Sequence, residues 1–179
     1  MQNVILEIVE NTKVSLDVYL MRLKGDLSSI KNSGEFVEIK LDGYYLRRPI
    51  SVCEFSENEL TILYKVLGHG TLDMTNYEVG KKLDVLVGLG NGFDITKAKE
   101  PLLVAGGIGI APLIGLAKRF NNLGIKPTLV YGAAKESDLV LLEELEKYTT
   151  LHITTDDGSL GFKGNPVTFL KENDIKYDY

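Results

Sequence analysis

The sequence predicts a fold of class β + α/β, in which an N-terminal antiparallel β-barrel precedes a doubly wound parallel sheet. Short segments of alternating apolar and polar residues fill the first half, which is typical of half-buried strands in a small barrel. In the second half, apolar strands alternate with amphipathic helices, which is typical of a parallel sheet covered on both faces. The pattern changes near residues 96–100, so we expect two domains, 1–97 and 98–179.

Four segments of the first half carry the strand pattern, and turn-rich stretches such as Lys31–Gly34 separate them. The expected strands are 13–20, 37–41, 60–66 and 83–87. Because each has one apolar face, the strands can close around a shared core.

The second half predicts a β-α-β-α-β-α order, which is Rossmann-like. The expected strands are 101–105, 127–131 and 149–154. One helix ends at Gly124, a second starts near Ser137, and a third starts at Asn165–Pro166 with an N-cap and a proline in its first position. Residues 175–179 look like the lead-in to a further buried strand. We therefore expect the sheet to be C-terminally incomplete and the chain to be a truncated piece of a longer protein.

Composition argues against several functions. The net charge is −5 and no basic run exceeds two residues, which argues against a nucleic-acid partner. The longest apolar run, 102–117, contains four glycines and a proline, so we expect no membrane-spanning helix. The first residues lack the pattern of a signal peptide, and a cytoplasmic protein is expected. Cys53 is the only cysteine, so no cysteine-rich metal site is expected in this chain.

A glycine-rich loop, Ala105–Pro112, follows the first strand of the second half and opens a helix. Backbone N–H groups in such a loop bind a pyrophosphate, and glycines let the phosphates approach the backbone. The spacing differs from Gly-x-Gly-x-x-Gly because Pro112 stands where the third glycine would be, and Tyr131–Ala133 stands where an acidic residue would end the next strand. The loop indicates a nucleotide site; a turn that only packs strand on helix is the alternative.

Two shorter motifs in the first half offer contacts to phosphate and flavin. Arg47–Ser51 lies between two expected strands; an arginine can bind phosphate oxygens through two N–H groups, and a serine can hydrogen-bond a flavin ring edge. Gly68–Thr71 follows the strand that ends at Val66, and its N–H and hydroxyl groups can bind a pyrophosphate. Taken alone, each motif is weak, and a surface arginine or a hairpin glycine is the simpler explanation.

The order of these motifs resembles that of ferredoxin-reductase-type flavoproteins, in which a flavin-binding β-barrel precedes a nucleotide-binding sheet. Within this ferredoxin-reductase-like superfamily, the chain resembles the electron-transfer subunit of type B dihydroorotate dehydrogenase along nearly its whole length. The segments that carry the closer resemblance are Leu46–Ser51, Leu63–Lys65, Gly68–Thr71, Gly88–Phe93 and Asp156–Gly161.

The resemblance implies that the barrel binds FAD and that the second domain binds NAD(H). The implied FAD contacts are Arg48, Pro49, Ile50, Ser51, Tyr64, Lys65, Val66, Gly70 and Thr71. The implied NAD contacts are Gly106, Gly107, Gly109, Ala111 and Pro112. Ser51 would lie near the flavin ring, hydride would pass between the nicotinamide and flavin N5, and no acid–base residue is implied.

The resemblance further implies a role in pyrimidine biosynthesis, in which electrons pass between NAD+ and a separate catalytic subunit that carries FMN and oxidises dihydroorotate. A heterotetramer of the two subunits is expected. Two departures stand out: Ser33–Phe36 replaces the family's usual Pro-Gly-Gln-Phe, and the family's Cys-Gly-Pro motif and the four cysteine ligands of its [2Fe-2S] cluster are absent. This chain as it stands is therefore not expected to hold that cluster.

Two alternatives stay open. One is the small subunit of a sulfide dehydrogenase or an NADH-dependent ferredoxin:NADP oxidoreductase, against which Arg47–Ser51 argues. The other is a non-catalytic flavin- or nucleotide-binding docking module, which the absent cysteines favour slightly. NADH is expected over NADPH from the resemblance and from the absence of an arginine near Tyr131–Ala133.

Overall fold

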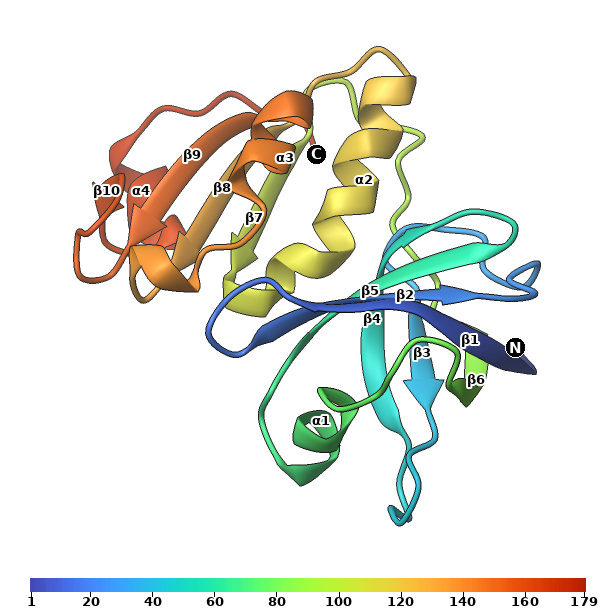
Figure 1. Ribbon diagram of the computed structural model, residues 1–179. Coiled ribbons are helices and arrows are strands. Elements are labelled where there is room, and N and C mark those ends of the chain that lie inside the picture. The colour runs from blue at the N-terminus through green and yellow to red at the C-terminus, as the bar shows by residue number, and fades with distance from the viewer. The chain divides into compact units, whose positions relative to one another are not determined.

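The chain folds into two compact units (Figure 1). The computed structural model describes every residue, Met1–Tyr179. The first unit is Met1–Phe93 and the second is Asp94–Tyr179, so the division falls slightly before the expected boundary at residue 97. None of the helices is both long enough and apolar enough to cross a membrane.

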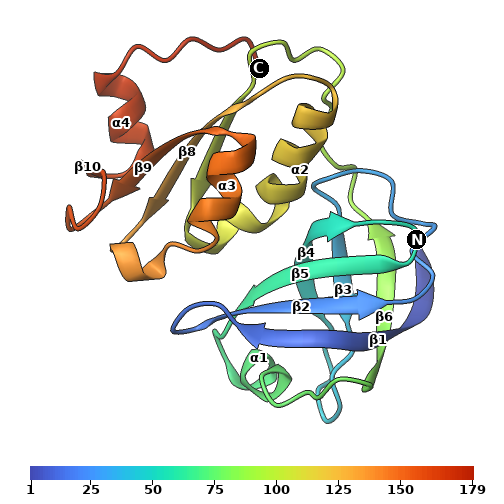
Figure 2. The same ribbon diagram turned by 45° about the horizontal axis from the view of Figure 1, so that its top comes forward.

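The first unit is a closed barrel with the strand order β1-β2-β5-β4-β3-β6 (Figure 2). Its strands are β1 (Gln2–Lys13), β2 (Val18–Lys24), β3 (Phe36–Ile39), β4 (Arg48–Phe55), β5 (Glu59–Lys65) and β6 (Lys82–Leu89). A short helix, α1 (His69–Met74), connects β5 to β6. Neighbouring strands pair antiparallel throughout, and closure protects the sheet edges. The predicted antiparallel barrel is confirmed.

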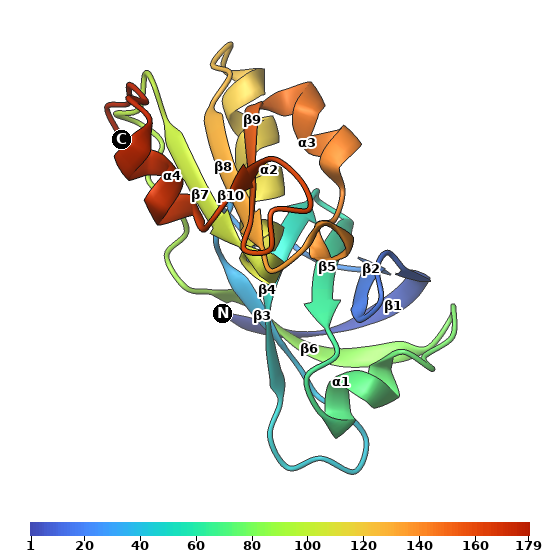
Figure 3. The same cartoon turned by 90° about the vertical axis from the view of Figure 1, so that its left-hand side faces the viewer.

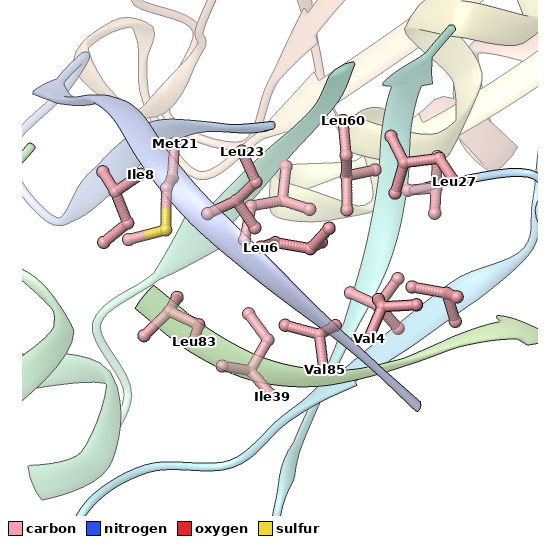
Figure 4. Packing of buried hydrophobic residues seen from close by; sticks show 14 of the residues in the cluster. Val4, Leu6, Ile8, Met21, Leu23, Leu27, Ile39, Leu60, Leu83 and Val85 are labelled. Atoms are coloured by element: carbon pink, nitrogen blue, oxygen red, sulfur yellow. The ribbon is translucent and has the colours of Figure 1, made fainter. Parts of the chain in front are cut away.

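The barrel core is built from alternate residues of the strands. In β1, Val4, Leu6 and Ile8 are buried, while the neighbouring Ile5 is 59% exposed. Figure 4 shows these buried side chains together with Leu23 and other apolar side chains from the facing strands. Burying each leucine or isoleucine contributes roughly 1.5–3 kcal/mol, so the alternating pattern itself drives barrel closure.

The expected strand at 13–20 is wrong, because the chain turns between β1 and β2 within it. The N–H groups of Val14 and Ser15 both donate to Val18 O, at 2.9 and 3.2 Å. Leu16, which completed the alternating pattern, is 74% exposed at this turn. The alternation therefore spans the end of one strand, a turn and the start of the next.

Two motifs of the first half also take a different local structure from the one expected. Arg48–Ser51 opens strand β4 instead of lying between strands, with Ser51 paired to Phe36 of β3. Pro49 is tolerated there because β4 pairs with β5 only from Val52 onward, so no partner needs its missing N–H. The Gly68–Thr71 segment begins α1, with Leu72 N donating to Gly68 O at 2.9 Å.

The second unit contains a parallel sheet with the order β10-β9-β8-β7. Its strands are β7 (Leu102–Gly106), β8 (Thr128–Ala133), β9 (Thr150–Thr155) and β10 (Phe162–Lys163). Its α-helices are α2 (Ala111–Asn122), α3 (Leu142–Tyr148) and α4 (Pro166–Glu172). Figure 3 shows α4 on one face of the sheet and α2 and α3 on the other. The predicted doubly wound parallel sheet is confirmed.

Both helix-end signals read from the sequence are confirmed. Gly124 follows α2 with a φ of +76°, which favours glycine, and Ile125 N donates to Phe120 O at 3.0 Å. The Asn165 side chain caps α4 by accepting a hydrogen bond from Thr168 N at 2.9 Å.

The rest of the second unit departs from expectation at two places. Helix α3 begins at Leu142 and not near Ser137, because Leu141 has a φ of +56° and changes the chain direction. The two-residue strand β10 was not expected. The last residues lie beside the start of β7, where Tyr179 O accepts a hydrogen bond from Leu102 N at 2.9 Å.

Glu35, just before β3, is a buried carboxyl group that is only 4% exposed. Its Oε1 accepts hydrogen bonds from the N–H groups of Lys31 and Asn32, at 3.0 and 2.9 Å. Its Oε2 has no hydrogen-bond partner. The carboxyl group therefore closes the preceding turn through one oxygen only.

We expect Glu35→Leu to lower the free energy of unfolding by about 1–3 kcal/mol, because two part-buried backbone N–H groups lose their acceptor. Glu35→Gln keeps the acceptor oxygen and is expected to cost about 1 kcal/mol or less. Urea unfolding of both variants measures the difference. Equal losses would show that the acceptor oxygen is not what stabilises the turn.

Candidate cofactor-binding sites

Arg48 and Gly70 lie against each other in the barrel unit. A Cβ atom on Gly70 would lie 2.7 Å from Nε and 2.9 Å from Nη2 of Arg48, so a larger residue there would displace the guanidinium group from this position. The same group lies over the Tyr44 ring, 4.8 Å from its centroid, and donates to Leu46 O. An arginine has five N–H donors, so donors remain for an anionic ligand.

The neighbouring Arg47 has a different role. Its Nη2 forms an ion pair with Asp84 Oδ1 at 2.9 Å, and its Nη1 donates to the carbonyl oxygens of Asp84 and Glu38, at 3.0 and 3.3 Å. Arg47 therefore joins β3 to β6, which are neighbours in the barrel. The structure separates the two arginines into one that supports the barrel and one that lies beside α1.

The Thr71 hydroxyl group is already engaged in its own turn. Its oxygen accepts hydrogen bonds from Leu67 N and Gly68 N, at 3.0 and 3.3 Å, and the hydroxyl group donates to Gly68 O at 3.1 Å. Thr71 therefore shapes the entry to α1. A phosphate contact through this hydroxyl, as the sequence suggested, would have to compete with these bonds.

Pro49, Ile50 and Ser51 follow Arg48 along β4. Successive side chains of a strand point to opposite faces, so Pro49 and Ser51 share one face. Pro49 is exposed and Ser51 is half-buried, whereas Ile50 packs against the barrel core. Ser51 therefore lies on the outer side of the barrel wall, where a ligand can reach it.

Tyr64, Lys65 and Val66 differ in their access to a ligand. Tyr64 is only 1% exposed, its side chain belongs to the barrel core, and burial raises the pKa of its hydroxyl group well above the usual value. Lys65 Nζ forms an ion pair with Asp17 Oδ2 at 3.2 Å, and Val66 is half-buried. Tyr64 can therefore offer a ligand its backbone but not its side chain.

The glycine-rich loop lies at the carboxyl end of β7. Gly106 ends the strand, Gly107–Ile110 forms a 3-10 turn, and α2 begins at Ala111 with Pro112 in its first turn. A Cβ atom placed on Gly106, Gly107 or Gly109 would meet no atom within 4 Å. Gly107 also has a φ of +52°, which favours glycine. The space beside these glycines is open, as an approaching phosphate requires.

The loops that follow β8 and β9 are tied together at the same end of the sheet. Ser159 Oγ accepts a hydrogen bond from Glu136 N at 2.8 Å and donates to Asp157 Oδ1 at 2.6 Å. The hydrogen bonds from Ser159 lower the pKa of the Asp157 carboxyl group, which is therefore charged at neutral pH. A carboxylate thus faces solvent near the carboxyl ends of the strands.

Gly132 in β8 serves packing and not ligand binding. A Cβ atom there would lie 2.5 Å from Pro166 Cδ and 2.7 Å from Thr154 Oγ1. No group of three or more His, Cys, Asp or Glu side chains is arranged to hold a metal ion.

Known proteins similar to this chain were found by sequence. The family model described as the oxidoreductase NAD-binding domain matches residues 103–156. The electron transfer subunit of dihydroorotate dehydrogenase B (NAD(+)) from Fusobacterium nucleatum is 38% identical, over 94% of this chain and 70% of the relative. This chain belongs to the family of dihydroorotate dehydrogenase B electron transfer subunits. The subunit of the same name from Streptococcus mutans is 35% identical, over 97% of this chain and 70% of the relative.

Membership of the dihydroorotate dehydrogenase B family confirms the resemblance inferred from the motifs, and the matching domain model confirms the oxidoreductase class. Solved structures confirm the ferredoxin-reductase-like fold. The structure of an NADH-dependent reduced ferredoxin-NADP oxidoreductase superposes with a TM-score of 0.83 at 31% identity, over 93% of this chain and 62% of that one. A phthalate dioxygenase reductase superposes with a TM-score of 0.74 at 24% identity, over 87% of this chain and 52% of that one.

Sequence reasoning missed the residues that surround Arg48 and α1, namely Asn11, Tyr44 and Asp73. Tyr44 Oη donates to Asp73 Oδ2 at 2.7 Å, and the Asn11 amide bonds to the end of α1. Asn11 is distant in sequence from α1, whereas Tyr44 lies just before Arg48 and Asp73 lies within α1. None of the three belongs to a recognisable motif, so the sequence alone did not identify them.

Proposed function

We propose that this dihydroorotate dehydrogenase B electron transfer subunit moves electrons between NAD+ and a catalytic subunit through bound FAD. The observation that carries the proposal is the open space beside Gly106, Gly107 and Gly109 at the carboxyl end of β7, in a chain of this family. Ligands of parallel α/β sheets bind at this end.

The proposed FAD contacts lie in the barrel unit. They are Arg48, Pro49, Ile50, Ser51, Lys65, Val66, Gly70 and Thr71, with Tyr64 contributing its backbone alone. The fit rests on the Arg48 guanidinium group, which lies beside Gly70 and is suited to a pyrophosphate. Ser51, on the outer side of β4, is suited to hydrogen-bond the edge of the flavin ring.

The proposed NAD(H) contacts lie in the second unit. They are Gly106, Gly107, Gly109, Ala111 and Pro112. The open glycines let a pyrophosphate reach the backbone N–H groups, while Ala111 and Pro112 start α2. NADH is proposed as the preferred donor, supported by the family and by the absence of an arginine near Tyr131–Ala133.

Flavin and nicotinamide supply the hydride chemistry between them when they are bound. The protein binds and orients them: Arg48 neutralises phosphate charge, and the glycine loop fixes the nucleotide by its backbone. No side chain has to move a proton in this step, so the absence of a paired acid and base among the proposed contacts agrees with the proposal.

The partner in the proposal is the FMN-containing subunit that oxidises dihydroorotate in pyrimidine biosynthesis, in a cytoplasmic heterotetramer. The support is the name shared by the relatives, which are electron transfer subunits of a larger enzyme. The [2Fe-2S] cluster of the family does not fit this chain by itself, because Cys53 is its only cysteine and is buried in β4.

A second candidate function is that of an NADH-dependent ferredoxin:NADP oxidoreductase subunit, which the superposition at 31% identity favours. That protein is less similar in sequence than the Fusobacterium nucleatum subunit at 38%. We therefore keep the dihydroorotate dehydrogenase assignment as the conclusion.

The proposal is tested by the absorption spectrum of the purified chain, reconstituted with FAD, before and after anaerobic addition of NADH. We expect a bound-flavin spectrum that NADH bleaches, because both sites and the hydride step are then present. NADPH at the same concentration should bleach it more slowly. A chain that takes up no FAD, or whose flavin NADH does not reduce, would leave only a non-catalytic docking module.

A further inference from the structure

Asn11, in strand β1, links three parts of the barrel unit through its side-chain amide. Its Nδ2 donates to Met74 O at 2.9 Å and to Tyr77 O at 3.0 Å, and its Oδ1 accepts from Tyr64 Oη at 3.0 Å. Both N–H groups of the amide therefore donate a hydrogen bond, and its oxygen accepts one. The partners lie 53 to 66 positions away in the sequence.

The hydrogen bonds donated by the Asn11 side chain fix the end of α1. Met74 is the last residue of this helix, and Tyr77 lies in the turn that follows it. Carbonyl groups at a helix end have no partner within the helix, and the Asn11 side chain in strand β1 supplies a donor to Met74 O. Since α1 has only six residues, its position depends on such tertiary contacts and not on its own helical propensity.

The buried tyrosine orients the amide. Because the Tyr64 hydroxyl group donates to Oδ1, the N–H groups of Asn11 are directed at Met74 and Tyr77. The Tyr64 ring is itself held by stacking on Tyr19, with 5.6 Å between the ring centroids. The amide therefore has one defined orientation.

The same helix carries Gly70, which lies against the guanidinium group of Arg48. Both Gly70 and Met74 are buried, so the two ends of α1 are seated on the barrel together. A shift of the Met74 end would move Gly70 relative to Arg48. The geometry of the proposed phosphate contact thus depends on a residue that is far from it in the sequence.

We propose that Asn11 is a positioning residue for the proposed FAD pyrophosphate site, acting through α1 on the Arg48–Gly70 contact. The inference rests on the proposed function, because it requires that the barrel binds FAD. Tyr64 supports it by orienting the Asn11 amide, which gives a role to a side chain that is too buried to touch the cofactor.

The test compares binding of FAD with binding of riboflavin, which has the same ring system but no phosphate. Asn11→Asp keeps the size of the side chain and the acceptor for Tyr64, but it directs an oxygen at the carbonyl groups of Met74 and Tyr77. We expect the FAD dissociation constant to rise about tenfold or more, with the riboflavin constant changed by about twofold or less. Tyr64→Phe keeps both bonds to α1 and should raise the FAD constant by about threefold or less.

Leu23→Ala serves as the control for general destabilisation, because Leu23 is fully buried in the barrel core and is neither a proposed FAD contact nor a hydrogen-bond partner of Asn11. Its ratio of FAD to riboflavin affinity should match that of the unsubstituted chain. If Asn11→Asp weakens both ligands equally, or neither, the inference is wrong while the FAD site stands. If the unsubstituted chain binds riboflavin and FAD equally weakly, the proposed function fails and the inference fails with it.

Discussion

Arg48→Ala is expected to weaken FAD binding by about 10- to 150-fold, which corresponds to roughly 1.5–3 kcal/mol for lost hydrogen bonds to a charged phosphate. The guanidinium group lies over Tyr44 and against Gly70, so it is oriented before any ligand arrives. Little free energy is then spent on ordering it. Flavin fluorescence during titration of the apoprotein measures the change, and urea unfolding should show little loss of stability without ligand.

Arg47→Ala is the matched control, because it removes the same residue type one position away. Arg47 bonds to Asp84 of β6 and to Glu38 of β3, and so links these two neighbouring strands. The side chains of the ion pair are mostly buried, with Arg47 23% and Asp84 29% exposed. We expect a loss of about 1–2 kcal/mol in the free energy of unfolding and an FAD affinity within about threefold of the original. The opposite outcome, with Arg47→Ala abolishing FAD binding and Arg48→Ala having no effect, would reverse the assignment of the two arginines.

The contrast between these two arginines shows where sequence-based prediction ends. The sequence predicts a barrel and a parallel sheet because apolar periodicity is a local property, readable in β5, in β7 and in α2 alike. The glycine-rich loop is local as well, since a strand, three glycines and a helix follow one another directly. Which arginine faces α1 depends instead on the register of β4 against β3, and the sequence does not state that register.

Other errors have a related physical cause. Residues 13–20 alternate like a strand, yet Leu16 is exposed in a turn, because an alternating pattern records polarity and not pairing. Helix α3 starts late because Leu141 adopts a left-handed conformation, which its residue type disfavours and which only the surrounding structure can impose. Tyr64 follows a family motif, but its burial within the closed barrel is set by strands that lie elsewhere in the chain.

Gly109→Val is expected to reduce kcat/KM for NADH by about 100-fold while leaving FAD content unchanged. A Cβ atom on Gly109 meets nothing within 4 Å, so the protein itself has room for the larger side chain. The room it occupies is the space that the proposal assigns to the NADH pyrophosphate. Loss of one or two hydrogen bonds to a charged phosphate costs about 1.5–3 kcal/mol each, which gives the expected factor.

The comparison variant is Gly132→Ala, a smaller change in the same unit. Here a Cβ atom would lie 2.5 Å from Pro166 and 2.7 Å from Thr154, so α4 must move away from β8 and the free energy of unfolding should fall by about 1–3 kcal/mol. Rates of flavin reduction by NADH and unfolding curves, measured on both variants, separate the two effects. Gly109→Val should lose rate and keep its stability. If it keeps its rate as well, the open space beside the loop does not receive NADH, and the nucleotide must bind elsewhere on this unit.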